Sequence, residues 1–111
     1  MSMPVHIAFL TKGLKEDFDS LQEGKFQDKQ LYSYICRAQD DLKKNPSSGT
    51  KLPKRLWPKE YVQKWEITNL WKYDLPNSWR LVYTIEADDV KILAIILEWF
   101  NHKEYERRFG Y

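Results

Sequence analysis

The last ten residues of the chain, 102–111, concentrate side chains that could do chemistry. They hold one histidine, two tyrosines, two arginines and a lysine, and they follow a long apolar segment. An imidazole can move a proton at neutral pH, and a guanidinium can hold a phosphate through two N–H donors at once. Phosphodiester cleavage without a metal uses these groups. A frayed polar tail is the alternative, although Tyr105, Phe109 and Tyr111 are unusual in a solvated tail.

His102 and Tyr105 are the two candidate proton-transfer or stacking groups in this segment. If residues 102–108 are helical, His102, Tyr105 and Glu106 share one face of the helix. The imidazole could take a proton from an attacking hydroxyl or protonate a leaving oxygen, and the sequence leaves both roles open. The phenol of Tyr105 could stack on a base or donate a hydrogen bond to phosphate. His6, in an apolar segment near the N-terminus, receives no role.

Arg80 is the third candidate catalytic residue. It is expected in the middle of a strand, on the face opposite Trp79 and Leu81. One interpretation is structural, with the guanidinium stacked on an aromatic ring or paired with a glutamate. The other is a phosphate clamp, in which a cation on a rigid strand stabilises the charge that develops on the phosphorane oxygens.

Further basic and aromatic residues are candidates for contacts with a phosphate backbone. Residues 51–72 contain six cations and two carboxylates, whereas residues 15–23 are acidic. Lysines in a loop add sequence-independent affinity for a phosphate backbone, although an ordinary solvated loop is an equal alternative. One of the two C-terminal arginines is expected to bind substrate and the other to be solvated. The RNA-binding candidates are Lys51, Lys54, Arg55, Arg107, Arg108 and Tyr111.

The elements that must position these residues follow from the apolar pattern. Runs of β-favouring residues predict strands, and apolar residues at helical spacing predict an α-hairpin. The predicted strands are 4–11, 65–74, 79–86 and 90–100, and the predicted helices are 14–23 and 28–44, the second with Asp28 as its N-cap. The apolar stripe of the hairpin consists of Leu14, Phe18, Leu21, Leu31, Ile35 and Leu42.

This element order predicts an α+β fold in one domain, 1–111. Short turns between the last three strands indicate an antiparallel meander, and with the N-terminal strand they form a four-stranded sheet. We expect the helical hairpin to cover one face of that sheet. The other face and the end of the last strand are then free to carry a site.

Composition limits the class of protein. The chain has 111 residues, of which 42% are hydrophobic and 15% aromatic, and these values exclude a disordered chain. Cys36 is the single cysteine, so neither a disulfide framework nor a cysteine-rich metal site can form. No signal peptide is recognisable, and residues 90–100 are too short to span a bilayer. We therefore expect a cytoplasmic protein with no membrane association, no metal and no cofactor.

Three sequence motifs and their order carry a family resemblance. Asn69-Leu70-Trp71-Lys72, then Trp79-Arg80-Leu81-Val82-Tyr83, then His102-Lys103-Glu104-Tyr105 resemble the RelE/ParE superfamily of toxins from type II toxin–antitoxin systems. Asn45-Pro46 with the following Gly49, after the second helix, is also similar to that family. The likeness spans nearly the whole chain. The His-x-x-Tyr step is similar to the histidine-bearing, RelE-like mRNA interferase branch.

The resemblance implies a metal-independent mRNA endoribonuclease, acting on the ribosome or on free mRNA. The ribose 2′-hydroxyl would attack the adjacent phosphorus and leave a 2′,3′-cyclic phosphate. It also implies a cognate antitoxin that wraps or blocks the protein. The alternatives are a ParE-like toxin that does not cleave RNA, and a binding-only or regulatory protein with the same fold. The sequence leaves open the oligomeric state, the base preference and the antitoxin.

Overall fold

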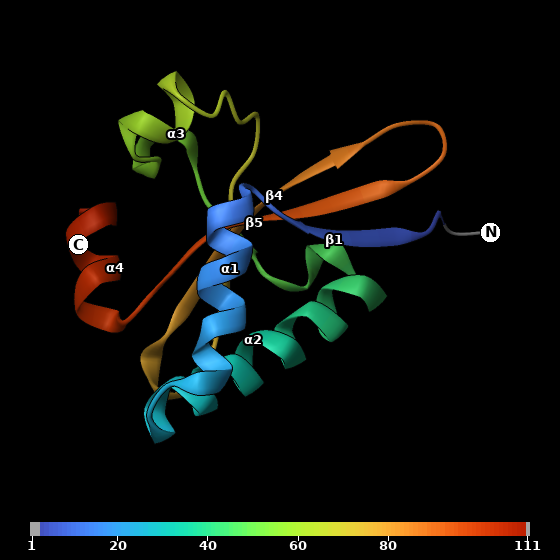
Figure 1. Cartoon of the computed structure of the whole chain (residues 1–111). Helices are drawn as coiled ribbons and strands as arrows, with labels where there is room; N and C mark the ends of the chain where they lie inside the picture. Colours follow the sequence, from blue (N-terminus) through green and yellow to red (C-terminus); the bar gives the residue numbers. More distant parts are fainter. Residues whose placement is uncertain (1–2, 111) are drawn as a thin grey trace.

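A five-stranded mixed sheet forms the centre of the molecule (Figure 1). The computed structural model describes residues 3–110. The strand order is β1-β5-β4-β3-β2, in which β1 runs parallel to β5 and every other pair is antiparallel. The strands are β1 (Val5–Phe9), β2 (Thr50–Lys51), β3 (Trp71–Asp74), β4 (Arg80–Ala87) and β5 (Ile92–Phe100). The α+β class and the antiparallel meander are as predicted.

The predicted sheet of four strands is wrong by one strand. The short strand β2 adds to the free edge of β3, and the preceding Gly49 permits this close approach. A Cβ at Gly49 would lie 2.4 Å from the carbonyl oxygen of Lys72. The predicted strand 65–74 is also too long, because extended structure starts only at Trp71. Glu66 has a φ of 51°, so the chain turns there and cannot continue as a strand.

The helical hairpin covers one face of the sheet, as predicted. It consists of α1 (Lys12–Ser20) and α2 (Phe26–Lys44). The predicted stripe packs on Leu81 and Tyr83 of β4 and on Ala94 and Ile96 of β5. Within that stripe Phe18, Leu31, Ile35 and Leu42 are buried, and Leu14 and Leu21 are partly buried against them.

Asp28 is not the N-cap of α2. Lys25 occupies that position, and the Asp28 carboxylate, in the third helical position, accepts the backbone N–H of Lys25 at 3.1 Å. A carboxylate in the first turn accepts a hydrogen bond from an N–H that has no partner within the helix. Its negative charge also interacts favourably with the positive end of the helix dipole. Asp28 therefore stabilises the start of the helix from inside the first turn.

The prediction that helices cover only one face is wrong. Val82, Leu97 and Phe100 point to the second face, where they form a separate apolar cluster with Leu52, Tyr61, Leu70, Tyr105 and Phe109. Leu52 and Leu70 flank α3 (Lys59–Gln63), which contributes Tyr61. Tyr105 and Phe109 belong to α4 (His102–Phe109). Figure 1 shows α3 and α4 on the same side of the view, with α4 directly after β5. Strands that are apolar on both faces need cover on both.

No helix within residues 3–110 combines the length and the apolar character that a membrane span requires.

Candidate functional site

The antiparallel meander gathers three strand ends at one place. In the register of the sheet Asp74 pairs with Arg80, Lys72 with Val82, and Arg80 with Phe100. Because side chains alternate along a strand, the members of these pairs share one face. The end of β3, the start of β4 and the end of β5 therefore meet beside α4, which begins two residues after Phe100.

Arg80 is the first residue of β4, so its predicted place in the middle of a strand is wrong. Its Nε lies 2.9 Å from Asp74 Oδ1, and its Nη1 donates to the Trp79 carbonyl at 3.2 Å. The guanidinium carbon lies 5.7 Å from the centroid of the Tyr105 ring. Both the aromatic stacking and the carboxylate pairing weighed from the sequence are present, although the carboxylate belongs to an aspartate. These contacts fix the direction of the guanidinium.

Helix α4 presents His102 and Glu106 on one face. The Asn101 side chain caps the helix by accepting the Glu104 N–H at 2.8 Å, and Gly110 ends it in the left-handed conformation with φ of 74°. His102 Nε2 lies 2.6 Å from Glu106 Oε1, one helical turn away. Both side chains are about half exposed. The imidazole is thus accessible to a ligand and oriented by a carboxylate.

Tyr105 is buried, unlike His102. Its relative exposure is 3%, and its ring stacks on Phe109 with centroids 4.5 Å apart. It lies between the second apolar cluster and the guanidinium of Arg80. Tyr105 is therefore placed to orient the Arg80 guanidinium by packing its ring against it.

A single pocket joins these groups. It has a volume of about 280 Å³ and is lined by Lys72, Arg80, His102, Tyr105 and Glu106. The side chains of Lys72 and Arg80 are only 18% and 19% exposed. Two largely buried cations beside a titratable imidazole are suited to binding an anion and to transferring a proton at it.

The predicted RNA-binding residues of the 51–55 segment lie outside this pocket. Lys51 Nζ lies 6.0 Å from the centroid of the Trp71 ring, and Trp71 packs against the cluster on the helical-hairpin face. Lys54 and Arg55 belong to a short 3-10 helix and are exposed. The structure therefore does not gather them with Arg80 and His102.

The two C-terminal arginines have different surroundings. Arg107 is exposed, with Nη1 3.5 Å from Glu104 Oε1. Arg108 is paired with Glu60 and Glu98, and its guanidinium lies 5.7 Å from the centroid of the Tyr61 ring. Arg108 thus ties α4 to α3 and β5. The prediction for Tyr111 falls outside the described residues.

Arg108 and Tyr61 share the carboxylate of Glu98. The Tyr61 hydroxyl donates to Glu98 Oε1 at 2.8 Å, and burial, followed by the charge of Glu98, raises the pKa of the Tyr61 phenol well above its ordinary value. Tyr61 is therefore a neutral hydrogen-bond donor at physiological pH. Within residues 3–110 no three His, Cys, Asp or Glu side chains gather closely enough to hold a metal ion.

Three residues of the site are not among the candidates predicted from the sequence. Lys72 and Asp74 belong to the predicted strand 65–74, and Glu106 is predicted only to share a helix face with His102 and Tyr105. The available signal was the i, i+2 spacing of Lys72 and Asp74, which places both on one face of β3. Only the pairing of β3 with β4 shows that this face is also that of Arg80.

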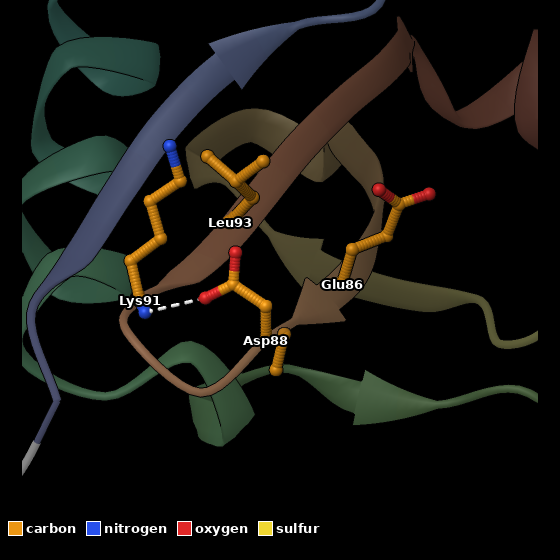
Figure 2. A pocket seen from close by; sticks show the side chains of 5 residues that line it. Glu86, Asp88, Lys91 and Leu93 are labelled. Atoms are coloured by element: carbon orange, nitrogen blue, oxygen red, sulfur yellow. Dashed lines mark hydrogen bonds between the residues drawn. The ribbon is translucent and has the colours of Figure 1, made fainter.

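A second hollow lies at the opposite end of β4. Figure 2 shows it at the β4–β5 hairpin, where Glu86, Asp88, Lys91 and Leu93 surround a volume of about 110 Å³. Asp88 Oδ1 accepts the backbone N–H groups of Val90 and Lys91, each at 2.8 Å. These bonds lower the pKa of Asp88. The carboxylate therefore closes the turn, and the side chains of Glu86 and Lys91 lie apart, with Asp88 and Leu93 between them.

No known protein family, no curated protein and no solved structure matches this chain.

Proposed function

We propose that this chain is the RelE-like toxin of a type II toxin–antitoxin system, and that it cleaves mRNA without a metal. One observation carries the proposal: Lys72, Arg80 and His102 line the same pocket. The family resemblance of the three motifs supplies the substrate class. The proposed setting is the cytoplasm, with mRNA on the ribosome or free and with a cognate antitoxin as partner.

In the proposed reaction the ribose 2′-oxygen attacks the adjacent phosphorus. A P–O2′ bond forms, the P–O5′ bond breaks, and the products are a 2′,3′-cyclic phosphate and a 5′-hydroxyl. The 2′-hydroxyl loses a proton and the leaving oxygen gains one. His102 transfers one of these protons, as a base when neutral or as an acid when protonated. Arg80 and Lys72 stabilise the charge on the phosphorane oxygens.

The test is cleavage of mRNA by the purified protein, with and without ribosomes and with and without a chelator. We expect products that end in a 2′,3′-cyclic phosphate and activity that survives the chelator. His102→Ala should lower the rate by about 10²–10⁴-fold. His6→Ala is the matched control, since His6 is exposed on β1 and lies outside the pocket.

Products with a 3′-hydroxyl, or an unchanged rate in His102→Ala, would reject the mechanism. A protein that remains toxic in cells but cleaves no RNA would favour the ParE-like or binding-only alternative.

A further inference from the structure

The carboxylate of Asp74 lies between the two cations of the pocket. Asp74 Oδ1 is 2.8 Å from Lys72 Nζ and 2.9 Å from Arg80 Nε. The Asp74 side chain is 59% exposed, whereas those of Lys72 and Arg80 are 18% and 19% exposed. The carboxylate therefore sits on the solvent side of two largely covered cations.

Asp74 also occupies one of the binding edges of Arg80. A guanidinium binds a carboxylate or phosphate through pairs of adjacent N–H groups. Arg80 Nη1 donates a hydrogen bond to the Trp79 carbonyl. The Nε atom is buried and has no well-aligned hydrogen bond among the described residues, although Asp74 touches it. An anion can reach the Nε edge only if Asp74 moves.

We propose that Asp74 competes with the substrate's phosphate for Arg80 and Lys72, and that it is displaced when the phosphate binds. The inference rests on the proposed function in naming RNA as the source of the phosphate. The competition itself requires no cleavage.

The exchange is feasible on electrostatic grounds. A phosphodiester carries one negative charge, as the Asp74 carboxylate does, so the two cations keep one singly charged anionic partner when the phosphate replaces the carboxylate. The Asp74 side chain is 59% exposed, so its carboxylate is already partly hydrated, and water can replace the contacts that it loses on displacement. After displacement the carboxylate remains close to the bound phosphate and repels it. Removing its charge should therefore strengthen anion binding.

The experiment compares wild type with Asp74→Asn in binding a single-stranded 2′-O-methyl oligonucleotide, which has no 2′-hydroxyl to attack phosphorus, and inorganic phosphate. We expect Asp74→Asn to lower the Kd for both ligands about fivefold at low salt, with a smaller gain at high salt. Asp89→Asn is the matched control, because it makes the same charge change in the exposed β4–β5 turn at the other end of β4. Its Kd should stay within twofold of wild type.

A second measurement does not depend on a variant. In wild type, inorganic phosphate should shift the side-chain carboxyl carbon resonance of Asp74 in NMR spectra, with the same Kd as binding itself. An equal or weaker affinity in Asp74→Asn, an equal gain in Asp89→Asn, or an Asp74 resonance that phosphate leaves in place would overturn the inference. Failure of the proposed function is distinguishable, since it would appear as absent RNA cleavage with this competition intact.

Discussion

Arg80 is held by three neighbours of different chemical kinds: the carboxylate of Asp74, the carbonyl of Trp79 and the ring of Tyr105. A side chain restrained in this way loses little further entropy when it binds an anion. The Arg80 side chain is 19% exposed, so these neighbours cover most of the guanidinium and leave part of it accessible to solvent. Arg80 is therefore already oriented in the free protein, with its Nε edge covered by Asp74.

We expect Arg80→Ala to slow RNA cleavage about 10²–10³-fold, the usual effect of removing one donor that stabilises transition-state charge. Cleavage kinetics under single-turnover conditions measure this. Arg37→Ala is the control, since Arg37 is exposed on α2, which packs on the other face of the sheet. A similar loss of rate in both variants would mean that the effect comes from the overall positive charge of the protein and not from the pocket.

At the scale of elements, α4 links the site to the second apolar cluster. Its buried residues Tyr105 and Phe109 anchor it on the sheet, while His102 and Glu106 face the pocket. The position of the imidazole therefore depends on how well the start of α4 is formed. The Asn101 cap controls that start.

Asn101→Ala should destabilise the protein by about 0.5–2 kcal/mol, because the Glu104 N–H loses its acceptor. It should also reduce cleavage, since fraying of the first turn releases His102. Asn101→Asp keeps the cap and should retain both properties. Urea denaturation and cleavage assays test the pair, and equal behaviour of the two variants would show that the cap does not position the imidazole.

The packing of α2 gives a second prediction at this scale. Leu42 is 0% exposed, and Leu42→Ala should cost about 2–5 kcal/mol because it leaves a cavity. Leu42→Asp should prevent folding, since it buries a charge without a partner. Asp40→Ala, at an exposed position of the same helix, should change stability by less than about 0.5 kcal/mol. A normal melting temperature in Leu42→Asp would contradict the assigned core.

At the scale of the whole molecule, a buried and a partly buried tyrosine join segments that are distant in sequence. The Tyr83 hydroxyl donates to the Pro46 carbonyl at 2.7 Å and accepts the Gly49 N–H at 3.2 Å. The Tyr73 hydroxyl donates to Asp41 of α2. Burial raises the pKa of Tyr83 to about 12, and burial together with the Asp41 carboxylate raises the pKa of Tyr73 to about 12.

These raised pKa values predict alkaline unfolding. The folded state holds the phenolic protons more tightly than the unfolded state, in which the pKa is about 10. Their contribution to stability is fully present below about pH 10 and is lost as the pH rises through about 12. Urea denaturation across this range should show the decline, and Tyr83→Phe should make it shallower. An equally steep decline in Tyr83→Phe would exclude Tyr83 as a source.

The partner prediction also belongs to the whole molecule. We expect the antitoxin to lay a segment that folds on binding over the basic and aromatic surface, with carboxylates at Arg80 or at the 51–55 cluster. Lys54→Glu with Arg55→Glu should weaken the complex about tenfold, because each exposed ion pair contributes up to about 1 kcal/mol.

Co-expression with the product of the neighbouring open reading frame, followed by affinity measurement, tests this interaction. Lys91→Glu, in the exposed β4–β5 turn, is the control. Absence of a complex, or a complex that is insensitive to the double charge reversal, would contradict the prediction.

The sequence by itself determined the helical hairpin and the strands of the meander. Helical spacing of Leu31, Ile35 and Leu42 identified α2 and its buried face, and alternation along 79–86 identified β4. The short predicted turns at 75–78 and 87–89 identified the meander. These features depend on residues close together in the chain, where apolar period and turn composition decide the outcome.

Only the tertiary structure decided how the site is assembled and what covers the second face. The register between β3 and β4 places Lys72 and Asp74 beside Arg80, and the burial of Tyr105 under the guanidinium depends on where α4 docks. The first depends on the register of a hairpin, and the second is a contact between segments far apart in the sequence. Apolar periodicity alone specifies neither, because register also depends on turn geometry and helix docking depends on the fit of whole faces to one another.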